Sequence, residues 1–422
     1  MDNIIDILKA RGLVEDMTSP DLAKALTKPA TVYAGFDPTS SSLQAGNLVA
    51  VMTLAHFQRA GHKTIALVGG ATGMIGDPSG KEQERQLLSV EEVGRNAEGI
   101  RENLARFLDF DHPTAPARIV NNQDWLGGFT FLEFLRDVGK HFRMGTMLGK
   151  ESVRARLAST GGMSYTEFSY QLLQAYDFLH LHDTAGCTVQ VGGSDQWGNI
   201  TAGTDLIRRL RGMEAFGLTT PLVCDSNGQK FGKSEGNAVF LSAARTSPYA
   251  FYQFFFRSTD ADVIRYLKTF TFVPLEEIAA LDEQTRKEPE QRTAQRRLAE
   301  EVTRAVHGAA GVQSAQRASA VLFGESMDGL DADMLLDVFR DVPSRELPRA
   351  QVEGAAVVAL VEAAGVCASR GAARRLIDSG GLYLNNRRIV DAAAAVAAGD
   401  LISGRLLVLR SGKKNFYLVK VV

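Results

Sequence analysis

The sequence predicts an α/β fold built on a parallel sheet, followed by an α-helical segment and a small α+β segment at the C-terminal end. Three segments are the evidence for strands of this sheet. Each is an apolar run that ends in glycine-rich polar residues: 31–39, 63–80 and 188–199. Amphipathic stretches such as LVAVMTLAHFQRAG separate them, and strands that alternate with helices form parallel sheets with helices on both faces. The first part of the chain is therefore expected to be Rossmann-like.

The polar turns after these three runs are the expected ligand site. In parallel α/β sheets ligands bind beyond the carboxyl ends of the strands, where the three turns would lie together. The first turn, GFDPTSSSLQAGN at 35–47, leads into a helix expected to begin near Leu48. A helix start offers unpaired N–H groups to an anion, so a phosphate-bearing ligand is indicated.

The remainder of the chain differs in composition from this first part. Residues 246–324 predict packed helices without strands, and 325–352 mix acids with prolines, which indicates a linker. The tail opens with a helical pattern and continues as strand-like pieces such as GLYLNN and FYLVKVV. The expected division is 1–245 as the catalytic Rossmann-like domain, 246–324 as a helical domain, 325–352 as linker and 353–422 as a small α+β module.

Charge is distributed unevenly between the tail and the body. Residues 353–422 carry 10 Lys and Arg against 5 Asp and Glu, and the rest of the chain carries 37 against 44. A basic module on an acidic body is typical of nucleic-acid contact. A solvated basic surface is the alternative that charge by itself leaves open.

Several classes of protein are excluded or disfavoured by composition. The three cysteines are far apart and form no CxxC pattern, so neither a zinc site nor a disulfide framework is supported. The N-terminal stretch carries acids, unlike a signal or transit peptide, and no apolar run approaches the roughly 18 residues of a membrane span. The expectation is a cytoplasmic protein that does not bind membranes.

Two common nucleotide motifs are absent, which leaves a third arrangement. GGATGMIG lacks the G-x-G-x-x-G register, and GDPSGK lacks the spacing of a P-loop. The remaining candidate combines the turn at 35–47 with a distant loop, 226–241. Lys230, Lys233 and Ser234 in that loop can bring two ammonium groups and a hydroxyl to one polyphosphate, although a solvated surface turn would have the same pattern.

Five ordered motifs carry a family resemblance. GFDPTSSSLQAGN resembles the HIGH loop, and KFGKS the KMSKS loop, of class I aminoacyl-tRNA synthetases. MIGDPSGK, TEFSYQLLQAYDF and VGGSDQWGNI narrow the resemblance to bacterial-type tyrosyl-tRNA synthetase, from about Tyr33 to the end of the chain. The resemblance implies a tyrosine–tRNA ligase, which forms tyrosyl-adenylate and pyrophosphate from L-tyrosine and ATP and then transfers tyrosine to the 3′ end of tRNA(Tyr).

By this resemblance, Tyr33 and Asp177 bind the phenolic hydroxyl of the substrate. A pocket that hydrogen-bonds this hydroxyl leaves buried polar groups unpaired when phenylalanine enters, which is a penalty against the wrong substrate. Asp77, Tyr170 and Gln174 are expected at the α-amino group, and Gln196 near the carboxyl group.

Helical spacing gives partial support from the residues alone. Tyr170, Gln174 and Asp177 stand at i, i+4 and i+7, which is one face of a helix. Such a polar stripe is usually a solvated face, but the aromatic residues around it indicate burial. Buried polar groups need partners, and a ligand can be one.

The resemblance also implies how ATP is bound and activated. Thr39 and Gln44 are expected at the γ-phosphate, Asp195 and Gly192 at the ribose, and Asp37 near the nucleotide and the substrate amino group. The implied catalytic residues are Thr39, Gln44, Asn47, Lys81, Arg85, Lys230, Lys233 and Ser234, and the implied ATP-binding residues are Gly35, Asp37, Gly46, Gly192, Asp195 and Lys233. Mg²⁺ is expected on the ATP phosphates, with no protein metal site and no tightly bound cofactor.

One departure from the family pattern concerns the first loop. Where the family typically has His-x-Gly-His, this sequence has Gln44-Ala45-Gly46-Asn47. Gly46 keeps the backbone accessible, and the two amides supply donors without needing a protonation state. The hypothesis is that the loop stays competent, with the lysines providing most of the charge at the phosphates.

Alternatives from other classes remain open at this point. A catalytically weakened relative retained as an RNA-binding protein is supported only by the missing histidines, and the tryptophan enzyme is the nearest class I neighbour. The tail resembles an RNA-binding module of the small ribosomal subunit, with Arg370, Arg374, Arg375, Arg387 and Arg388 as its basic cluster. The family is dimeric, and the segment 129–148 is either an interface or ordinary core.

Overall fold

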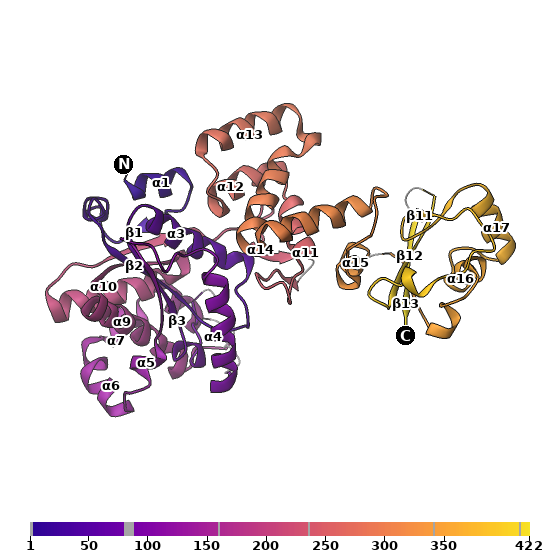
Figure 1. The fold of residues 1–422 in the computed structure, drawn as a ribbon. Helices are drawn as coiled ribbons and strands as arrows, with labels where there is room; N and C mark the ends of the chain where they lie inside the picture. The colour runs from indigo at the N-terminus through magenta and orange to yellow at the C-terminus, as the bar shows by residue number, and fades with distance from the viewer. Residues whose placement is uncertain (1–2, 80–87, 159–160, 235–236, 341, 413–414) are drawn as a thin grey trace. The chain divides into compact units, whose positions relative to one another are not determined.

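The computed structural model describes residues 3–79, 88–158, 161–234, 237–340, 342–412 and 415–422 (Figure 1). Two compact units are present: residues 1–245 with 256–306, and residues 246–255 with 307–422. The predicted helical segment 246–324 is therefore shared between the units. The four-part domain division from the sequence stays a prediction.

A six-stranded sheet forms the centre of the first unit. Its strand order is β1-β6-β5-β2-β3-β4, and every neighbouring pair is parallel except β1 with β6. The strands are β1 (Asp16–Met17), β2 (Thr31–Phe36), β3 (Lys63–Val68), β4 (Ala117–Asn121), β5 (Cys187–Gly193) and β6 (Phe216–Thr220). The three apolar runs identified in the sequence are β2, β3 and β5, so the predicted α/β fold with a parallel sheet is confirmed.

Helices cover this sheet because their apolar residues need burial against it. Tyr33, Ile65 and Leu67 of the sheet share a core with Ala175 and Phe178 of α9 (Tyr165–Ala185) and with residues of α10 (Trp197–Arg211). In Figure 1, α9 and α10 lie together beside the strands. A capping box of Ser164 and Glu167 starts α9, and Gly186 ends it in the left-handed conformation that suits glycine.

The other helices of the first unit connect or extend this core. Helix α3 (Leu48–Arg59) begins at the predicted position and packs against β2, β3 and β5. The remaining helices are α1 (Ile4–Ala10), α2 (Leu22–Ala25), α4 (Val90–Leu104), α5 (Gln123–Leu126), α6 (Phe131–Asp137), α7 (Met144–Leu148), α8 (Glu151–Leu157), α12 (Asp260–Phe270) and α13 (Leu275–Lys287). A two-stranded ribbon, β7 (Lys233–Ser234) with β8 (Asn237–Ala238), belongs to the lysine loop.

The second unit contains a five-stranded sheet of order β11-β10-β12-β13-β9. Its strands are β9 (Ser344–Leu347), β10 (Leu382–Leu384), β11 (Arg387–Arg388), β12 (Leu406–Ser411) and β13 (Asn415–Val421), and its helices α11 (Pro248–Phe256), α15 (Ala332–Val338), α16 (Val357–Ala363) and α17 (Arg370–Asp378). Helix α14 (Thr293–Val321) is shared between the units and is interrupted at Gly308, where φ is 72°.

The segment predicted as a linker, 325–352, has more structure than its acids and prolines indicated. It contains α15 and β9, and β9 pairs in parallel with β13 at the edge of the second sheet. Leu335 and Phe339 are buried in a core with Phe416 and Leu418. Apolar residues at helical spacing give this segment a face that is buried, and this burial stabilises a helix although the surrounding residues are polar.

Candidate active site

Two buried groups stand at the centre of the candidate pocket. Tyr33 on β2 and Asp177 on α9 are only 1% and 2% exposed. The centroid of the Tyr33 ring lies 5.2 Å from that of the Phe178 ring. The Tyr33 hydroxyl has no hydrogen-bond partner among the described residues. A buried hydroxyl without a partner is unfavourable, so this atom is available to a ligand that brings a matching group.

The Asp177 carboxylate is oriented by two donors from the segment after β4. Asn122 Nδ2 donates to Oδ2 over 3.0 Å, and Trp125 Nε1 donates to Oδ1 over 2.8 Å. Burial raises the pKa of Asp177 to about 7, although these two bonds act in the opposite direction. Burial, with the Asp177 charge as a second cause, also raises the pKa of Tyr33 well above its ordinary value.

A chain of hydrogen bonds connects this carboxylate to a second one. Asn122 Nδ2 also lies 3.0 Å from Thr72 Oγ1, and the Thr72 hydroxyl donates to Asp37 Oδ1 over 2.8 Å. The Tyr170 hydroxyl donates to Asp37 Oδ2 over 2.7 Å. Elements β2, β3, β4 and α9 are thus joined at the carboxyl end of the sheet by one polar network.

A separate group of polar side chains surrounds Asp77. Gln196 Nε2 donates to Asp77 Oδ2 over 2.6 Å, and Asn199 Nδ2 lies 3.1 Å from Gln174 Oε1 and 3.2 Å from Gln196 Oε1. Asp77, Gln174 and Gln196, which the sequence assigned to the two ends of the amino-acid backbone, are therefore brought together. Amide and carboxylate groups at this density suit a zwitterion.

The carboxyl end of β2 is accessible to solvent at Gly35. Gly35 is exposed although β2 lies between β3 and β5, and it follows Tyr33 by two residues on the same face. A Cβ at Gly192 would lie only 3.0 Å from the Gln196 Cβ. Small residues at both strand ends thus leave room for a ligand over the sheet and for Gln196 beside it.

The two predicted phosphate loops contact each other through their backbones. A Cβ at Gly232, where φ is 102°, would lie 3.0 Å from the Gly46 nitrogen, and a Cβ at Gly46 would lie 3.3 Å from the Phe231 oxygen. The Ala45 nitrogen donates to the Val239 oxygen over 2.8 Å. The positive φ of Gly232 favours glycine there, and at Gly46 a side chain would be tightly packed, so the loops at 35–47 and 226–241 lie in close backbone contact.

Within the first loop, the amide of Asn47 has a fixed orientation. The Gln44 backbone nitrogen donates to Asn47 Oδ1 over 2.9 Å, which leaves Nδ2 as the outward donor. Thr39 and Asn47 are exposed, and Gln44 is half-buried. Thr39 and Asn47 are therefore accessible to a ligand.

Lys230 is exposed on the second loop. Burial raises the pKa of Asp195, and the Asp77 charge adds to this shift, whereas the positive charge of Lys230 lowers it. Lys230 therefore lies near enough to Asp195 for its charge to act on that carboxyl group. Lys233 and Ser234 lie on β7, which follows directly, and Lys81 and Arg85 fall outside the described residues.

Comparison with known proteins places the chain in a family. Residues 24–324 match the family model for class I tRNA synthetases (W and Y), and residues 335–419 match that of the tyrosine–tRNA ligase SYY-like C-terminal domain. A tyrosine–tRNA ligase from Opitutus terrae is 53% identical over 99% of this chain and its whole length, and one from Protochlamydia amoebophila is 50% identical over the full length of both. The chain belongs to the class I tyrosyl-tRNA synthetases.

A solved member of the tyrosyl-tRNA synthetases has the same architecture. The C-terminally truncated mitochondrial tyrosyl-tRNA synthetase of Aspergillus nidulans superimposes with a TM-score of 0.68 at 33% identity, over 76% of this chain and 95% of its own. The resemblance inferred from the five sequence motifs is thus confirmed.

Four residues of this synthetase site were not assigned from the sequence: Thr72, Asn122, Trp125 and Asn199. Asn122 and Trp125 follow β4, a parallel strand whose short run ARIV carries only a weak strand signal in the sequence. The polar turn NNQDW after it is the signal that could have identified them. Asn199 lies in the DQWGN motif itself, and Thr72 in the glycine-rich turn after β3.

Neither a metal-binding cluster nor a membrane-spanning helix is present among the described residues. No group of three or more His, Cys, Asp or Glu side chains there is placed to hold a metal ion. Every helix in that part of the chain is too short or too polar to cross a membrane.

The raised pKa of Asp177 predicts a pH dependence of tyrosine affinity. Below about pH 7 the carboxyl group is mainly protonated, and above it the carboxylate is the stronger acceptor for a phenolic hydroxyl. Affinity measured by equilibrium dialysis should increase by up to about tenfold between roughly pH 6 and pH 8. The Asp177→Asn variant should show no such increase; a flat profile in the unmodified protein, or the same slope in the variant, would contradict the role of Asp177.

Proposed function

We propose that this protein joins L-tyrosine to tRNA(Tyr) in two steps, with tyrosyl-adenylate as the intermediate. The observation that carries the proposal is the buried pair of Tyr33 and Asp177, because the unpartnered hydroxyl and the oriented carboxylate match a phenolic O–H. In the bound state the substrate hydroxyl donates to Asp177 and accepts from Tyr33. Phenylalanine would leave both groups unpaired.

The amino-acid backbone of the substrate is proposed to lie between the groups around Asp37 and those around Asp77. Asp77, Tyr170 and Gln174 bind the α-amino group, and Gln196 lies near the carboxylate. Asp37 contributes on the nucleotide side, since its bond to Tyr170 connects the two halves of the site. The ribose of ATP is bound by Asp195 beside Gly192, and the open surface at Gly35 receives the ligand.

Activation needs no general base in this proposal. The tyrosine carboxylate is already ionised at neutral pH and attacks the α-phosphate of ATP, the bond to the β-phosphate oxygen breaks, and pyrophosphate leaves. In the second step a hydroxyl of the terminal ribose of tRNA attacks the tyrosyl carbonyl and releases AMP. Catalysis is then positioning together with stabilisation of charge on the leaving group.

The residues that stabilise this charge are proposed to lie on the two contacting loops. Thr39, Gln44 and Asn47 approach from the first loop, beside Gly46, and Lys230, Lys233 and Ser234 from the second. Lys81 and Arg85 are proposed to assist from the segment after Asp77. Mg²⁺ accompanies the ATP phosphates and shares in neutralising them.

Binding of tRNA and assembly of two subunits complete the proposal. Arg370, Arg374 and Arg375 on α17 and Arg387 and Arg388 on β11 are all exposed, which suits contact with RNA phosphates. Phe131 and Leu132 on α6 are 65% and 76% exposed, and Met144 and Leu148 on α7 are exposed as well. Apolar residues exposed together support the segment 129–148 as the interface of a homodimer, and the cytoplasm is the proposed location.

The weakened RNA-binding relative is the less favoured function. A protein that only binds RNA has no need for an unpartnered tyrosine hydroxyl beside an oriented carboxylate, nor for two phosphate loops in contact. Relatives of about 50% identity over the full chain are tyrosine–tRNA ligases.

The amino-acid dependence of pyrophosphate exchange into ATP tests the proposed function. Tyrosine should support exchange, and phenylalanine and tryptophan should not, because neither supplies a phenolic hydroxyl to Tyr33 and Asp177. Absence of exchange with tyrosine, while tRNA is still bound, would favour the RNA-binding alternative. Exchange with tryptophan would assign the chain to the other substrate of its family model.

Replacement of Gln44 tests the proposed role of the first loop. Gln44→Ala should slow adenylate formation by about tenfold or more, because one donor to the phosphates is lost in the transition state. Tyrosine affinity should remain nearly unchanged. Gln284→Ala, on α13, serves as the matched control; a collapse of tyrosine binding in Gln44→Ala would contradict this role.

A further inference from the structure

The lysine loop begins as a hairpin, residues 223–231, whose register is fixed by its own hydrogen bonds. The Phe231 nitrogen donates to the Val223 oxygen over 2.9 Å, and the Asp225 nitrogen to the Gln229 oxygen over 2.8 Å. Cys224 and Lys230 are directly paired across the hairpin as an isolated antiparallel bridge. The position of Lys230 therefore follows the position of Cys224.

The turn of this hairpin is closed by an acidic side chain. Asp225 Oδ1 accepts from the backbone nitrogens of Asn227 and Gln229 over 2.9 and 2.8 Å. Asx turns of this kind stabilise the hairpin locally. These bonds stabilise the hairpin as one unit, so its position in the protein depends on the element that it contacts.

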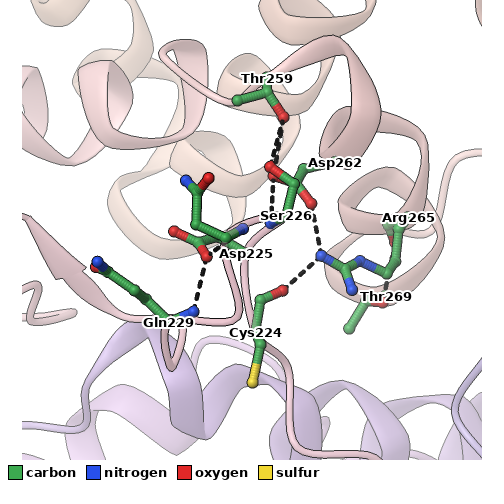
Figure 2. A network of polar contacts seen from close by, with 9 residues as sticks. Cys224, Asp225, Ser226, Gln229, Thr259, Asp262, Arg265 and Thr269 are labelled. Carbon is green, nitrogen blue, oxygen red and sulfur yellow. Dashed lines mark hydrogen bonds and ion pairs between the residues drawn. The ribbon is translucent and has the colours of Figure 1, made fainter.

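Helix α12 holds the first strand of the hairpin through two side chains, as Figure 2 shows. The Ser226 nitrogen donates to Asp262 Oδ2 over 3.0 Å, and the Thr259 hydroxyl donates to the same oxygen over 2.8 Å. Arg265 Nη2 donates both to Asp262 Oδ1 and to the Cys224 carbonyl oxygen. One guanidinium therefore bridges the helix carboxylate and the residue that pairs with Lys230.

The second strand of the hairpin is held by the same helix. The Phe231 ring lies 4.7 Å from that of Tyr266 and 4.8 Å from that of Phe270, the latter stacked. Phe231 directly follows Lys230, and Gly232 after it contacts Gly46 of the first loop. Lys230 is thus placed between a polar attachment on one strand and an aromatic attachment on the other.

We propose that Asp262 and Arg265 of α12 are positioning residues for Lys230. By holding Cys224 and Ser226, they determine where the Lys230 ammonium lies when pyrophosphate leaves. They act on the reaction through Lys230 and touch no substrate themselves. This inference rests on the proposed role of Lys230 at the phosphates.

Exposure separates this role from a contribution to folding. The Arg265 side chain is 48% exposed, whereas that of Asp262 is 4% exposed. When Arg265 is lost, the buried Asp262 carboxylate keeps the Ser226 nitrogen and the Thr259 hydroxyl as donors, which limits the cost to stability. A misplacement of a catalytic group by a fraction of its hydrogen-bond distance, in contrast, is costly to the rate. Loss of Arg265 should therefore affect catalysis more than stability.

Arg265→Ala is the primary test variant. The maximal rate of tyrosine-dependent pyrophosphate exchange should fall about tenfold, with the KM for tyrosine and the thermal unfolding midpoint nearly unchanged. Arg265→Lys should recover only part of the rate, because an ammonium cannot reproduce the geometry of a guanidinium bridge. Arg286→Ala, which removes an exposed pair with Asp282 on α13, is the matched control and should leave the rate unchanged.

A double-mutant cycle with Lys230→Ala decides whether the effect passes through Lys230. In the Lys230→Ala background, Arg265→Ala should cause no further loss, because the group that it positions is gone. Equal losses in both backgrounds, or an undiminished rate in Arg265→Ala, would overturn the inference. If Lys230→Ala itself exchanges at the unmodified rate, the role of Lys230 and this inference fall together, while tyrosine-dependent exchange would leave the ligase proposal intact.

Discussion

The carboxylate of Asp177 is the group around which the rest of the site is arranged. A charge buried to this extent needs hydrogen-bond partners, and those partners come from Asn122 and Trp125 after β4. Asn122 in turn contacts Thr72, which donates to Asp37, so that one buried acid is connected to side chains in the turns after β2, β3 and β4. The arrangement leaves the Tyr33 hydroxyl as a buried polar atom without a partner among the described residues.

This constraint explains why the site is suited to selection as well as to catalysis. In the proposed function, selection of tyrosine over phenylalanine depends on a pocket in which the hydrogen-bond partner of the Tyr33 hydroxyl is supplied by the substrate. Catalysis in the same proposal depends on a second region, where Gly46 and Gly232 bring the two loops into backbone contact. Because the nucleophile is already ionised, amides at positions 44 and 47 can serve where imidazoles are found in relatives with the usual motif.

Sequence patterns predicted the features that are local along the chain. Apolar runs that end in glycine-rich turns predict strands β2, β3 and β5. The family resemblance assigns Tyr170 and Asp177, and helical spacing supports this assignment by placing them on one face. That face is buried in the structure rather than solvated. Strand β4 is short and half-exposed, so its run lacked the signal that would have led to Asn122 and Trp125.

Features that depend on pairing between distant segments were beyond such patterns. Nothing local in the sequence joins Arg265 to Cys224, because the bond depends on how α12 meets the hairpin. The acids and prolines of 325–352 indicate a linker, and β13, the partner of β9, lies more than 60 residues away in the sequence and gives no local signal of the pairing. The roles of individual residues in binding remain predictions, which a ligand-bound structure can test.

A crystal structure with tyrosine bound is the most direct measurement of the central claim. The account predicts that the phenolic oxygen lies within about 3 Å of both the Tyr33 hydroxyl and the Asp177 carboxylate, with the ring over the sheet near Gly35. A tyrosine ring bound elsewhere, or a phenolic oxygen that contacts neither group, would contradict it.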